Sequence, residues 1–318
     1  MVFPQFLALP RVPRDLIIQK LDPVDILNFS FTSKKSLYLA KSAKVQVESF
    51  NWDFKKDGNV DIRISRGEGN PLTSILLQNF FNRKLDQRKN DRQIHSEIAS
   101  VPIALLKNPS PHELLIIYRS ELDERNPIEM ISERLLEILK VKTFSCETNC
   151  DSKAPFYIFN FTKNFKKLRF GSNEPLTHEE ARFLLEDLRV DDFRLNSSVK
   201  PGFVFTKPLS FRSISIVNAR WFTRENLILM DCERLTLGFH TIIDNADIID
   251  FIKKWKQGGF PKLQVLVVLF PETEWNLAVG PLDDKGDQVL KDTMGNVGKL
   301  RVLSSTTLLF FVNDAKVE

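Results

Sequence analysis

The stretch FLALPRVPRDLIIQKLDPVDILNFSFTSKKSLYLAKS, residues 6–42, decides how the chain begins to fold. It predicts a series of short helices. Pro13 can open the first of them, Arg14–Lys20, because a proline is tolerated in the first helical turn. Asp22 has a side chain suited to the N-cap of the second helix, and Pro23 is suited to its first helical position. The stretch therefore predicts two helices joined by a tight link.

A third helix is predicted over Lys34–Ser42, where Ser33 can act as the N-cap. Three helices of roughly two turns each make a core near the lower size limit for independent folding. We therefore expect this unit to be stabilised by something that it packs against.

After Lys44 the helical spacing of the apolar residues gives way to an alternation with polar residues. Apolar and polar residues alternate over 45–54 and over 60–64, on either side of the turn Asp57-Gly58-Asn59. This pattern predicts a β-hairpin. The segment Thr73–Leu85 is predicted to be a helix that follows it.

Strands and helices are both predicted beyond residue 95. The strands are Val101–Leu106 and Val141–Cys146, and the helices are His112–Leu122 and Ile128–Leu139. Asn126 and Pro127 supply a starting signal for the second helix.

The rest of the chain carries a recurring pattern of two apolar residues separated by one other residue. The pairs are Leu168/Phe170, Phe193/Leu195, Ile214/Ile216, Leu235/Leu237 and Leu263/Val265. Helices are predicted between some of them, most clearly over Thr177–Leu188 and Ala246–Lys256. One strand and one helix in each interval of about 20–30 residues is typical of leucine-rich-repeat-like arrays. An α/β sheet with βαβ crossovers would show similar spacing.

The composition excludes several classes of protein. The 45 basic and 41 acidic residues are intermixed, whereas a nucleic-acid binder would concentrate its cations on one face or in one block. Three cysteines are too few for a disulfide framework. The N-terminus is broken by prolines and has no basic region, and no apolar run approaches the length of a membrane span. We expect an intracellular, soluble protein, in the cytoplasm, the nucleus or both.

The chain offers little for catalysis or for metal binding. Cys146 and Cys150 have a plausible ligand spacing, but no second pair follows to complete a tetrahedral zinc site. His240 lies near Asp244 and Asp247, which are explained more simply as residues at the start of a helix. We therefore expect no catalytic residue, no metal and no cofactor.

The first 42 residues resemble the F-box motif. The Leu9-Pro10 pair, the spacing to Leu21-Asp22-Pro23, and Asp25-Ile26-Leu27 fall where that motif has them, as does Leu39-Ala40. Two positions depart from the motif. Val12 stands where an acidic residue is common, and Ser36 stands where many F-boxes carry a tryptophan.

The remainder resembles the type-2 F-box-associated domain found with nematode F-boxes. The stretches that carry this likeness are VPIALLK at 101–107, ERLLEILKVKTFSC at 133–146, and the run from Asn226 to Val268. In that run, the segments 232–237, 247–255 and 261–263 are the most similar. The two resemblances together cover most of residues 6–270.

The residue patterns and the resemblance together predict an α+β protein with three domains. These are an F-box over 6–43, a connecting region with a β-hairpin and a helix over 44–95, and an associated α/β, leucine-rich-repeat-like domain over 96–318 that recruits substrates. The F-box would bind a Skp-type adaptor and, through it, a cullin scaffold of a ubiquitin ligase. The apolar residues expected to be exposed for the adaptor are Leu9, Pro10, Ile17, Leu21, Pro23, Ile26 and Leu27.

A second surface is suggested by Arg220, Trp221 and Phe222, which follow a predicted strand. Arginine and aromatic residues are favoured in the hot spots of protein interfaces, so these three are candidates for binding the target protein. Packing of Trp221 against the next helix explains the same residues.

Three hypotheses for the function follow. The chain is a non-catalytic substrate receptor of a ubiquitin ligase, or an interaction module whose F-box binds the adaptor without recruiting a cullin, or an enzyme or nucleic-acid binder. Val12 and Ser36 favour the second. Only the modest excess of basic residues and scattered polar clusters favour the third.

Overall fold

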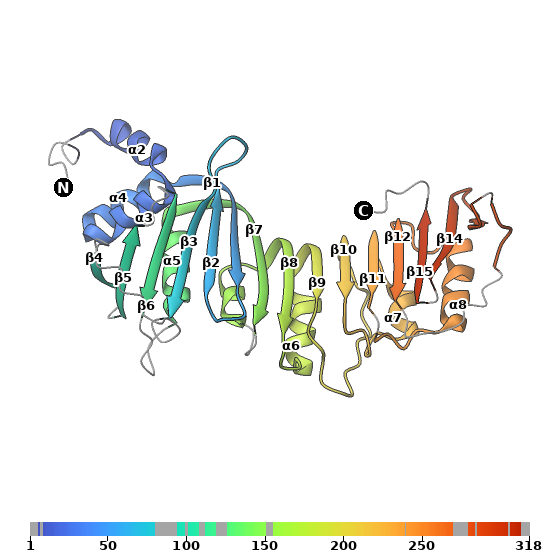
Figure 1. Cartoon of the computed structure of the whole chain (residues 1–318). Coiled ribbons are helices and arrows are strands. Elements are labelled where there is room, and N and C mark those ends of the chain that lie inside the picture. The colour runs from blue at the N-terminus through green and yellow to red at the C-terminus, as the bar shows by residue number, and fades with distance from the viewer. Residues whose placement is uncertain are drawn as a thin grey trace. The chain divides into compact units, whose positions relative to one another are not determined.

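The structure is a computed structural model that describes residues 6, 9–79, 94–98, 101–107, 112–118, 126–150, 155–238, 240–269, 279–283, 285–304 and 306–312. The chain divides into two compact units, Met1–Thr162 and Lys163–Glu318. Three helices come first and are followed by the strands of a large mixed sheet with few helices, so the predicted α+β class is confirmed (Figure 1). The boundary between the units does not coincide with the predicted division at residue 95. The three predicted domains stay a prediction.

The N-terminal helices are α2 (Arg11–Lys20), α3 (Pro23–Thr32) and α4 (Lys34–Ala43). All three predicted helices are present. Helix α2 begins three residues earlier than predicted, with Pro13 inside its first turn. A proline fits there because the first backbone N–H groups of a helix have no partner within the helix.

The strands of the first unit lie in the order β7-β1-β2-β3-β6-β5-β4. Their bounds are β1 Val45–Phe54, β2 Val60–Ser65, β3 Thr73–Asn79, β4 Ile94–Ile98, β5 Val101–Lys107, β6 Glu113–Tyr118 and β7 Leu139–Cys150. The hairpin predicted around residues 57–59 is confirmed, because β1 and β2 pair antiparallel. Helix α5 (Pro127–Ile138) and the short 3₁₀ segment η2 (Phe156–Asn160) complete the unit.

Two predicted helices of this unit are wrong. The segment predicted as helix Thr73–Leu85 forms strand β3 up to Asn79, and its remainder lies outside the described residues. The segment predicted as helix His112–Leu122 forms strand β6 up to Tyr118. The two strands pair in parallel with each other. A short apolar run fits a helix or a strand equally well by its own pattern, and here pairing with distant strands decides.

The core of the first unit is built around Trp52. Its ring is fully buried, with its centroid 4.6 Å from that of Phe50 and 5.8 Å from that of Phe144. Its indole N–H donates to the hydroxyl of Ser132 on α5 at 3.0 Å. A buried indole N–H needs such a partner, so this bond fixes α5 against the sheet.

The second unit contains a ladder of parallel strands in chain order. These are β8 (Asn164–Ser172), β9 (Arg189–Leu195), β10 (Ser213–Ile216), β11 (Arg234–Leu237) and β12 (Val265–Leu269). All five recurring apolar pairs lie on or next to these strands, although Leu263 lies just before β12. Strands β15 (Thr307–Val312), β14 (Val297–Ser304) and β13 (Gln288–Lys291) continue the sheet antiparallel.

Helices lie in three of the four connections between the parallel strands, and the described residues 196–212 between β9 and β10 form none (Figure 1). The predicted helix Thr177–Leu188 is present as α6 (His178–Arg182) followed by the π-helical turn η3 (Phe183–Asp187). Helix α7 is Arg224–Leu229, and α8, Asn245–Lys256, confirms the second predicted helix. Rows of apolar side chains, such as Leu168, Phe193 and Ile214, are fully or almost fully buried on one face of the ladder.

Gly238 lies at a point of close backbone approach in this ladder. Its N–H donates to the carbonyl of Ile216 at 2.8 Å. A Cβ atom at this position would lie only 2.1 Å from the carbonyl oxygen of Val217. The ladder therefore requires glycine at the end of β11.

We predict that Gly238→Ala destabilises the second unit by about 3 kcal/mol, because the backbone must move to admit the methyl group. Gly286→Ala is the matched control. Gly286 has a positive φ of 79° but nothing within 4 Å of a Cβ atom, so the expected cost is about 1 kcal/mol of backbone strain. Urea unfolding followed by tryptophan fluorescence measures both. Equal shifts in the two variants would contradict the close approach.

Candidate functional site

The link between α2 and α3 is organised by the carboxylate of Asp22. As predicted, Asp22 is the N-cap of α3, and its Oδ1 accepts a hydrogen bond from the N–H of Val24 at 2.9 Å. The other carboxylate oxygen lies 3.2 Å from Oγ1 of Thr73 at the start of β3 and 2.9 Å from Nδ1 of His112. One side chain therefore starts a helix and ties it to two separate segments of the sheet.

Arg66, in the connection between β2 and β3, adds a further tie. Its guanidinium donates to the backbone carbonyl of Leu21. Burial lowers the pKa of Arg66, and the nearby carboxylate of Asp22 opposes that shift. The link Leu21-Asp22-Pro23 is thus held by the sheet of the same unit. Sequence analysis missed Arg66 and His112, since no local pattern relates them to residues 21–23.

The residues predicted to dock an adaptor divide into two groups. Pro10 and Ile17 are exposed, while Leu9 and Leu21 are half-buried. The expectation of exposure is wrong for Pro23, Ile26 and Leu27, which are all buried. The reason is that α3 packs against α4, α5 and β3. Which of the seven contact an adaptor stays a prediction.

Several apolar side chains are exposed on α2 and α4, and sequence analysis did not select them. On α2 these are Val12 and Leu16, and Ile17, which was selected, is exposed as well; Leu16 is 54% and Ile17 43% exposed. On α4, which contacts α2, Tyr38 is also exposed. We call Val12, Leu16, Ile17 and Tyr38 the apolar patch. Exposed apolar side chains on two helices that contact each other are candidates for an interface. Leu16 could have been found from the sequence, because it is an apolar residue at the start of the run that also contains Ile17 and Ile18.

Ser36 has a defined structural role in α4. It is buried, and its hydroxyl lies 2.8 Å from those of Thr32 and Ser33. Ser33 caps the helix by accepting a hydrogen bond from the N–H of Ser36 at 3.0 Å, as predicted. The third helix is therefore well packed without the tryptophan that many related motifs carry.

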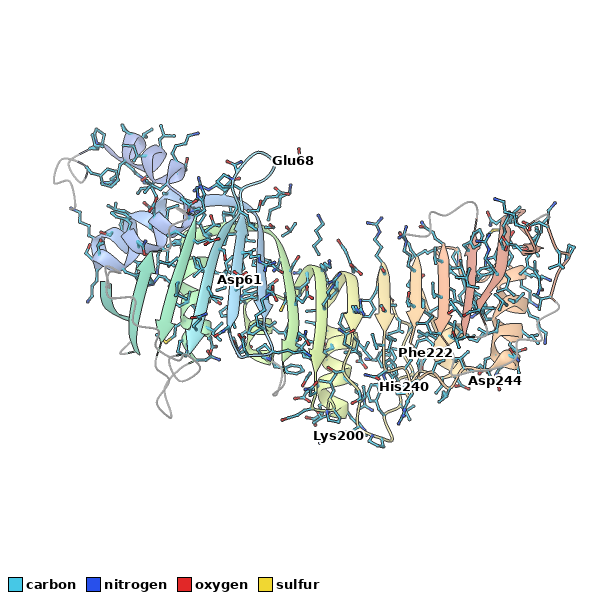
Figure 2. The ribbon with its side chains drawn as sticks, viewed as in Figure 1. Asp61, Glu68, Lys200, Phe222, His240 and Asp244 are labelled. Carbon is cyan, nitrogen blue, oxygen red and sulfur yellow. The ribbon has the colours of Figure 1, made fainter. Side chains whose placement is uncertain are left out.

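The predicted target-binding residues lie in the turn between β10 and α7. Arg220 is exposed, whereas Trp221 and Phe222 are buried, and binding of a target protein by these three residues stays a prediction. The ring of Trp221 packs edge-on against Phe203, at 5.3 Å between centroids. Figure 2 shows Phe222 with Lys200, His240 and Asp244 at the carboxyl ends of the parallel strands. Asp244 there caps α8, so it and Asp247 have the structural role that was expected.

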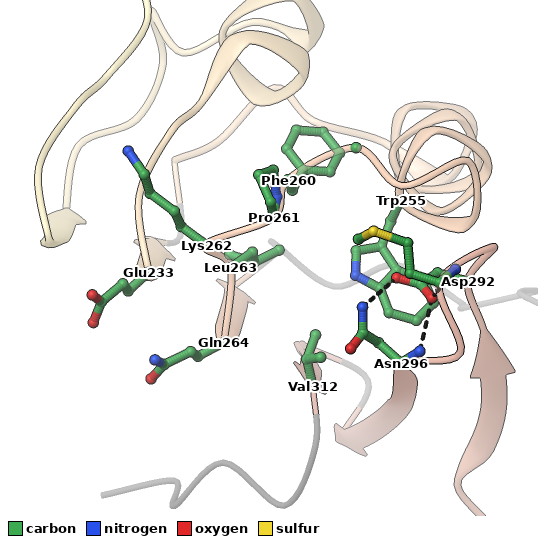
Figure 3. A pocket seen from close by; sticks show the side chains of 12 residues that line it. Glu233, Trp255, Phe260, Pro261, Lys262, Leu263, Gln264, Asp292, Asn296 and Val312 are labelled. Carbon is green, nitrogen blue, oxygen red and sulfur yellow. Dashed lines mark hydrogen bonds between the residues drawn. The ribbon is translucent and has the colours of Figure 1, made fainter.

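A cavity of about 510 Å³ lies near the amino ends of β11 and β12 (Figure 3). Its ionic groups are already engaged. Glu233 binds Arg212, and Lys262 binds Asp231. The carboxylate of Asp292 accepts hydrogen bonds from the backbone of its own loop. These contacts build the loops around the cavity, and they leave no pair of groups poised for acid–base chemistry.

The two described thiols are also explained by packing. Cys146 and Cys232 are both buried. Burial, helped by the adjacent carboxylate of Asp231, raises the pKa of Cys232 to about 12. Within the described residues, no group of three or more His, Cys, Asp or Glu side chains could hold a metal ion. Of the helices in the same residues, none is both long and apolar enough to cross a membrane.

These features define a class of protein. The helices α2–α4 carry exposed apolar side chains, and the link between α2 and α3 is hydrogen-bonded to the sheet of the first unit. Apolar side chains exposed in this way are candidates for contact with another protein. Comparison with known families makes the class specific: residues 6–47 match the F-box domain, and residues 205–268 match the family described as F-box associated.

The chain therefore contains an F-box domain and an F-box associated domain. An F-box implies binding of a Skp-type adaptor, and this pair of domains is typical of non-catalytic substrate receptors. No curated protein and no solved structure matched the chain in the same comparisons.

We predict that Asp22→Ala destabilises the first unit by about 2 kcal/mol, since it removes an N-cap worth about 1 kcal/mol and also leaves Thr73 and His112 without their acceptor. Ser33→Ala, which removes the cap of α4, should cost about 1 kcal/mol. Thermal unfolding of the two variants provides the measurement. A smaller loss for Asp22→Ala than for Ser33→Ala would show that the ties to the sheet contribute nothing.

We predict that Cys232 is not alkylated by iodoacetamide in the native protein at pH 8. A pKa of about 12 keeps the group as a thiol far above neutral pH, and the thiolate is the reactive form. Mass spectrometry of peptides from native and urea-unfolded protein tests this. Modification at the same rate in both samples would contradict the burial of Cys232.

Proposed function

We propose that this chain is the substrate-recognition subunit of a Skp–cullin–F-box ubiquitin ligase. The observation that carries the proposal is the apolar patch, because it lies within the residues that match the F-box domain. In this role the chain has no catalytic residue of its own. It acts by holding a target protein near the transfer machinery, which raises the local concentration of the target.

The adaptor side of the proposal rests on α2. Leu9, Pro10 and Leu21 flank the patch in sequence, and we include them with Ile17 in the adaptor-binding surface. Pro23, Ile26 and Leu27 are buried and belong to the core in which α3 packs against α4, α5 and β3. A partner that covers the patch shields these side chains from water. Full burial of one such side chain contributes about 1.5–3 kcal/mol to the binding free energy.

The second unit is the proposed target-binding part. We propose that β8–β12 are a repeat-like array of the leucine-rich-repeat kind. In support of this, the same backbone bond recurs at the end of successive strands: Asn196 to Phe170 at 2.8 Å, Val217 to Leu195 at 2.9 Å, and Gly238 to Ile216 at 2.8 Å. Asn218 also donates a side-chain hydrogen bond to the carbonyl of Asn196 at 2.7 Å. Such regular stacking between neighbours is typical of repeat proteins.

We predict that Leu16→Asp/Ile17→Asp lowers the affinity for a purified Skp-type adaptor at least about tenfold, which corresponds to about 1.4 kcal/mol. Both side chains are about half exposed, so the substitutions leave the core intact. Titration calorimetry with the full chain gives the affinity.

The matched control is Val204→Asp/Leu229→Asp. These residues are 62% and 41% exposed, close to the values for Leu16 and Ile17, but they lie in the second unit. The control should bind the adaptor as the unmodified chain does. Unchanged affinity in the α2 variant, with its helix content retained, would refute adaptor docking through the patch. Ile26→Asp is not suitable for this purpose, since Ile26 is part of the core.

The alternative is a module that binds the adaptor without a cullin. Val12 favours it, because an exposed apolar residue stands where the motif commonly has an acidic one. Reconstitution with adaptor and cullin separates the two functions. A stable complex of all three supports the ligase subunit, and a complex from which the cullin is missing supports the alternative.

A further inference from the structure

Three turns lie next to one another at the carboxyl ends of the parallel strands β9, β10 and β11. They are residues 196–203, 217–223 and 238–244, of which the structure describes all but residue 239. The N–H of Val217 donates to the carbonyl of Leu195 at 2.9 Å. The N–H of Gly238 donates to the carbonyl of Ile216 at 2.8 Å. The loops at the carboxyl ends of parallel strands are a common place for a binding site.

Trp221, in the middle turn, has an indole N–H without an acceptor. The residue is buried, with 7% exposure, and Nε1 has no hydrogen-bond partner. The rings of Phe203, Phe205 and Phe222 surround it, at 5.3–6.2 Å between centroids. An aromatic ring is a much weaker acceptor than an oxygen atom. A buried donor in this state is costly and calls for an explanation.

Trp52 shows the usual arrangement of a buried tryptophan. It is fully buried, and its indole N–H donates to the hydroxyl of Ser132 at 3.0 Å. Trp221 lacks such a partner, although it lies in a surface turn directly after the exposed Arg220. The fold therefore leaves one strong donor of this turn unused.

The same turns carry basic side chains that no carboxylate balances. Lys200 and Arg220 are exposed, and neither forms an ion pair with a described residue. His240, in the third turn, is exposed as well (Figure 2). In the described parts of the three turns the one acidic residue is Asp244, whose carboxylate accepts a hydrogen bond from the N–H of Asp247 at 3.0 Å. The turns therefore offer donors and cations, and their carboxylate is already engaged.

The acidic groups around these turns are engaged or lie at their border. Hydrogen bonds with Thr223 and with its own backbone lower the pKa of the exposed Glu225. Asp250 on α8 binds Arg224 at 2.8 Å. Glu174 is exposed in the turn after β8, so the basic stretch ends on that side.

We propose that these three turns bind a carboxylate of the target protein, with Arg220 as its ionic partner and the indole N–H of Trp221 as a hydrogen-bond donor. This inference rests on the proposed function, since it gives the target a place and a chemistry. Hydrogen bonds between arginine and a carboxylate are among the stronger polar contacts of proteins. Tryptophan and arginine are also enriched in the hot spots of interfaces.

An apolar side chain of the target has a place beside the carboxylate. Val204 lies between Phe203 and Phe205, the two rings that contact Trp221, and is itself 62% exposed. In the third turn Ile242 is 57% exposed. A segment that carries leucine next to glutamate matches this combination better than a uniformly charged one. It also favours a protein segment over a nucleic acid, whose backbone presents a phosphate at every nucleotide.

The test uses the full chain and a fluorescein-labelled peptide of the repeat Glu-Leu-Ser, with fluorescence anisotropy as the readout. The unmodified chain should bind this peptide. A peptide with Gln in place of Glu should bind at least about tenfold more weakly, because it has no carboxylate. Arg220→Gln should raise the Kd of the Glu peptide at least about tenfold. Arg220 is exposed, so this substitution leaves the core intact.

The control variant is Arg212→Gln. It removes the same charge from an exposed arginine at the opposite end of β10, where Arg212 pairs with Glu233 at 3.1 Å. Its Kd should stay within about twofold of the unmodified value, since exposed charges far from the site are screened. Equal weakening in both variants would mean attraction by net charge alone and would overturn the proposal.

The indole donor is tested separately by NMR of the ¹⁵N-labelled chain. The spectra of Trp221→Phe and Trp52→Phe identify the indole resonances of the two residues. The resonance of Trp221 should shift when the Glu peptide is added, because its N–H gains an acceptor. That of Trp52 should stay in place, because its N–H already donates to Ser132. A Trp221 resonance that does not move when the peptide saturates the chain overturns the proposal.

Trp221→Phe should also raise the Kd of the Glu peptide at least about fivefold, since it removes a hydrogen bond to a charged group. An unchanged Kd would contradict the donor. Arg220→Gln keeps the proposal testable if Trp221→Phe does not fold.

Two other outcomes also overturn it. One is that the Glu peptide does not bind the unmodified chain. The other is that a phosphoserine peptide or a single-stranded oligonucleotide binds more tightly and is lost in Arg220→Gln, since the turns would then recognise phosphate. Adaptor binding is measured on the same samples, so the two proposals fail separately. Loss of peptide binding with the adaptor retained overturns only the carboxylate site, whereas a chain that never binds the adaptor overturns the proposed function.

Discussion

Burial of α3 against the rest of the first unit is the constraint on which the N-terminal region depends. Three short helices cannot enclose a core of their own, and here Ile26 and Leu27 are fully buried because α5 and β3 complete it. Each such side chain contributes about 1.5–3 kcal/mol. The F-box of this protein is therefore not a detached module, because its inner face is also part of the core of the first unit. The carboxylate of Asp22 fixes where this shared core begins, since it caps α3 and reaches both Thr73 and His112.

Because of this shared core, apolar residues that are close in sequence differ in their exposure to solvent. Leu16, Ile17, Ile26 and Leu27 are all apolar and close in sequence, yet the first two face solvent and the last two do not. A binding experiment on Ile26 would thus report folding, whereas one on Ile17 reports the surface. The same reasoning applies to Trp221, whose ring packs against Phe203. Residue type suggested an interface there, whereas the ring itself is buried, so a substitution of Trp221 would change the packing as well.

The sequence was informative wherever the cause of a structure is local. Asp22, Ser33 and Asp244 act as N-caps because each side chain bonds to a backbone N–H within the next three residues. The hairpin at residues 57–59 and the five recurring apolar pairs are also local patterns. Strands β3 and β6 were mistaken for helices because their apolar runs are short. Each pairs with a strand that is near in sequence, β2 or β5, and the two also pair with each other across about forty residues. The ties from Arg66 and His112 to residues 21–22 could not be predicted for the same reason.

In the ladder of the second unit, the buried face determines the register of the strands. Arg169 lies directly opposite Arg194 on the neighbouring strand, and cross-strand pairs of side chains change the stability of a sheet by about 1 kcal/mol or less. On the opposite face, each fully buried side chain of the row Leu168, Phe193 and Ile214 contributes about 1.5–3 kcal/mol. The buried row outweighs this contribution, so the strands keep their register whatever charges the other face carries. The buried residues therefore determine where the side chains of that other face stand.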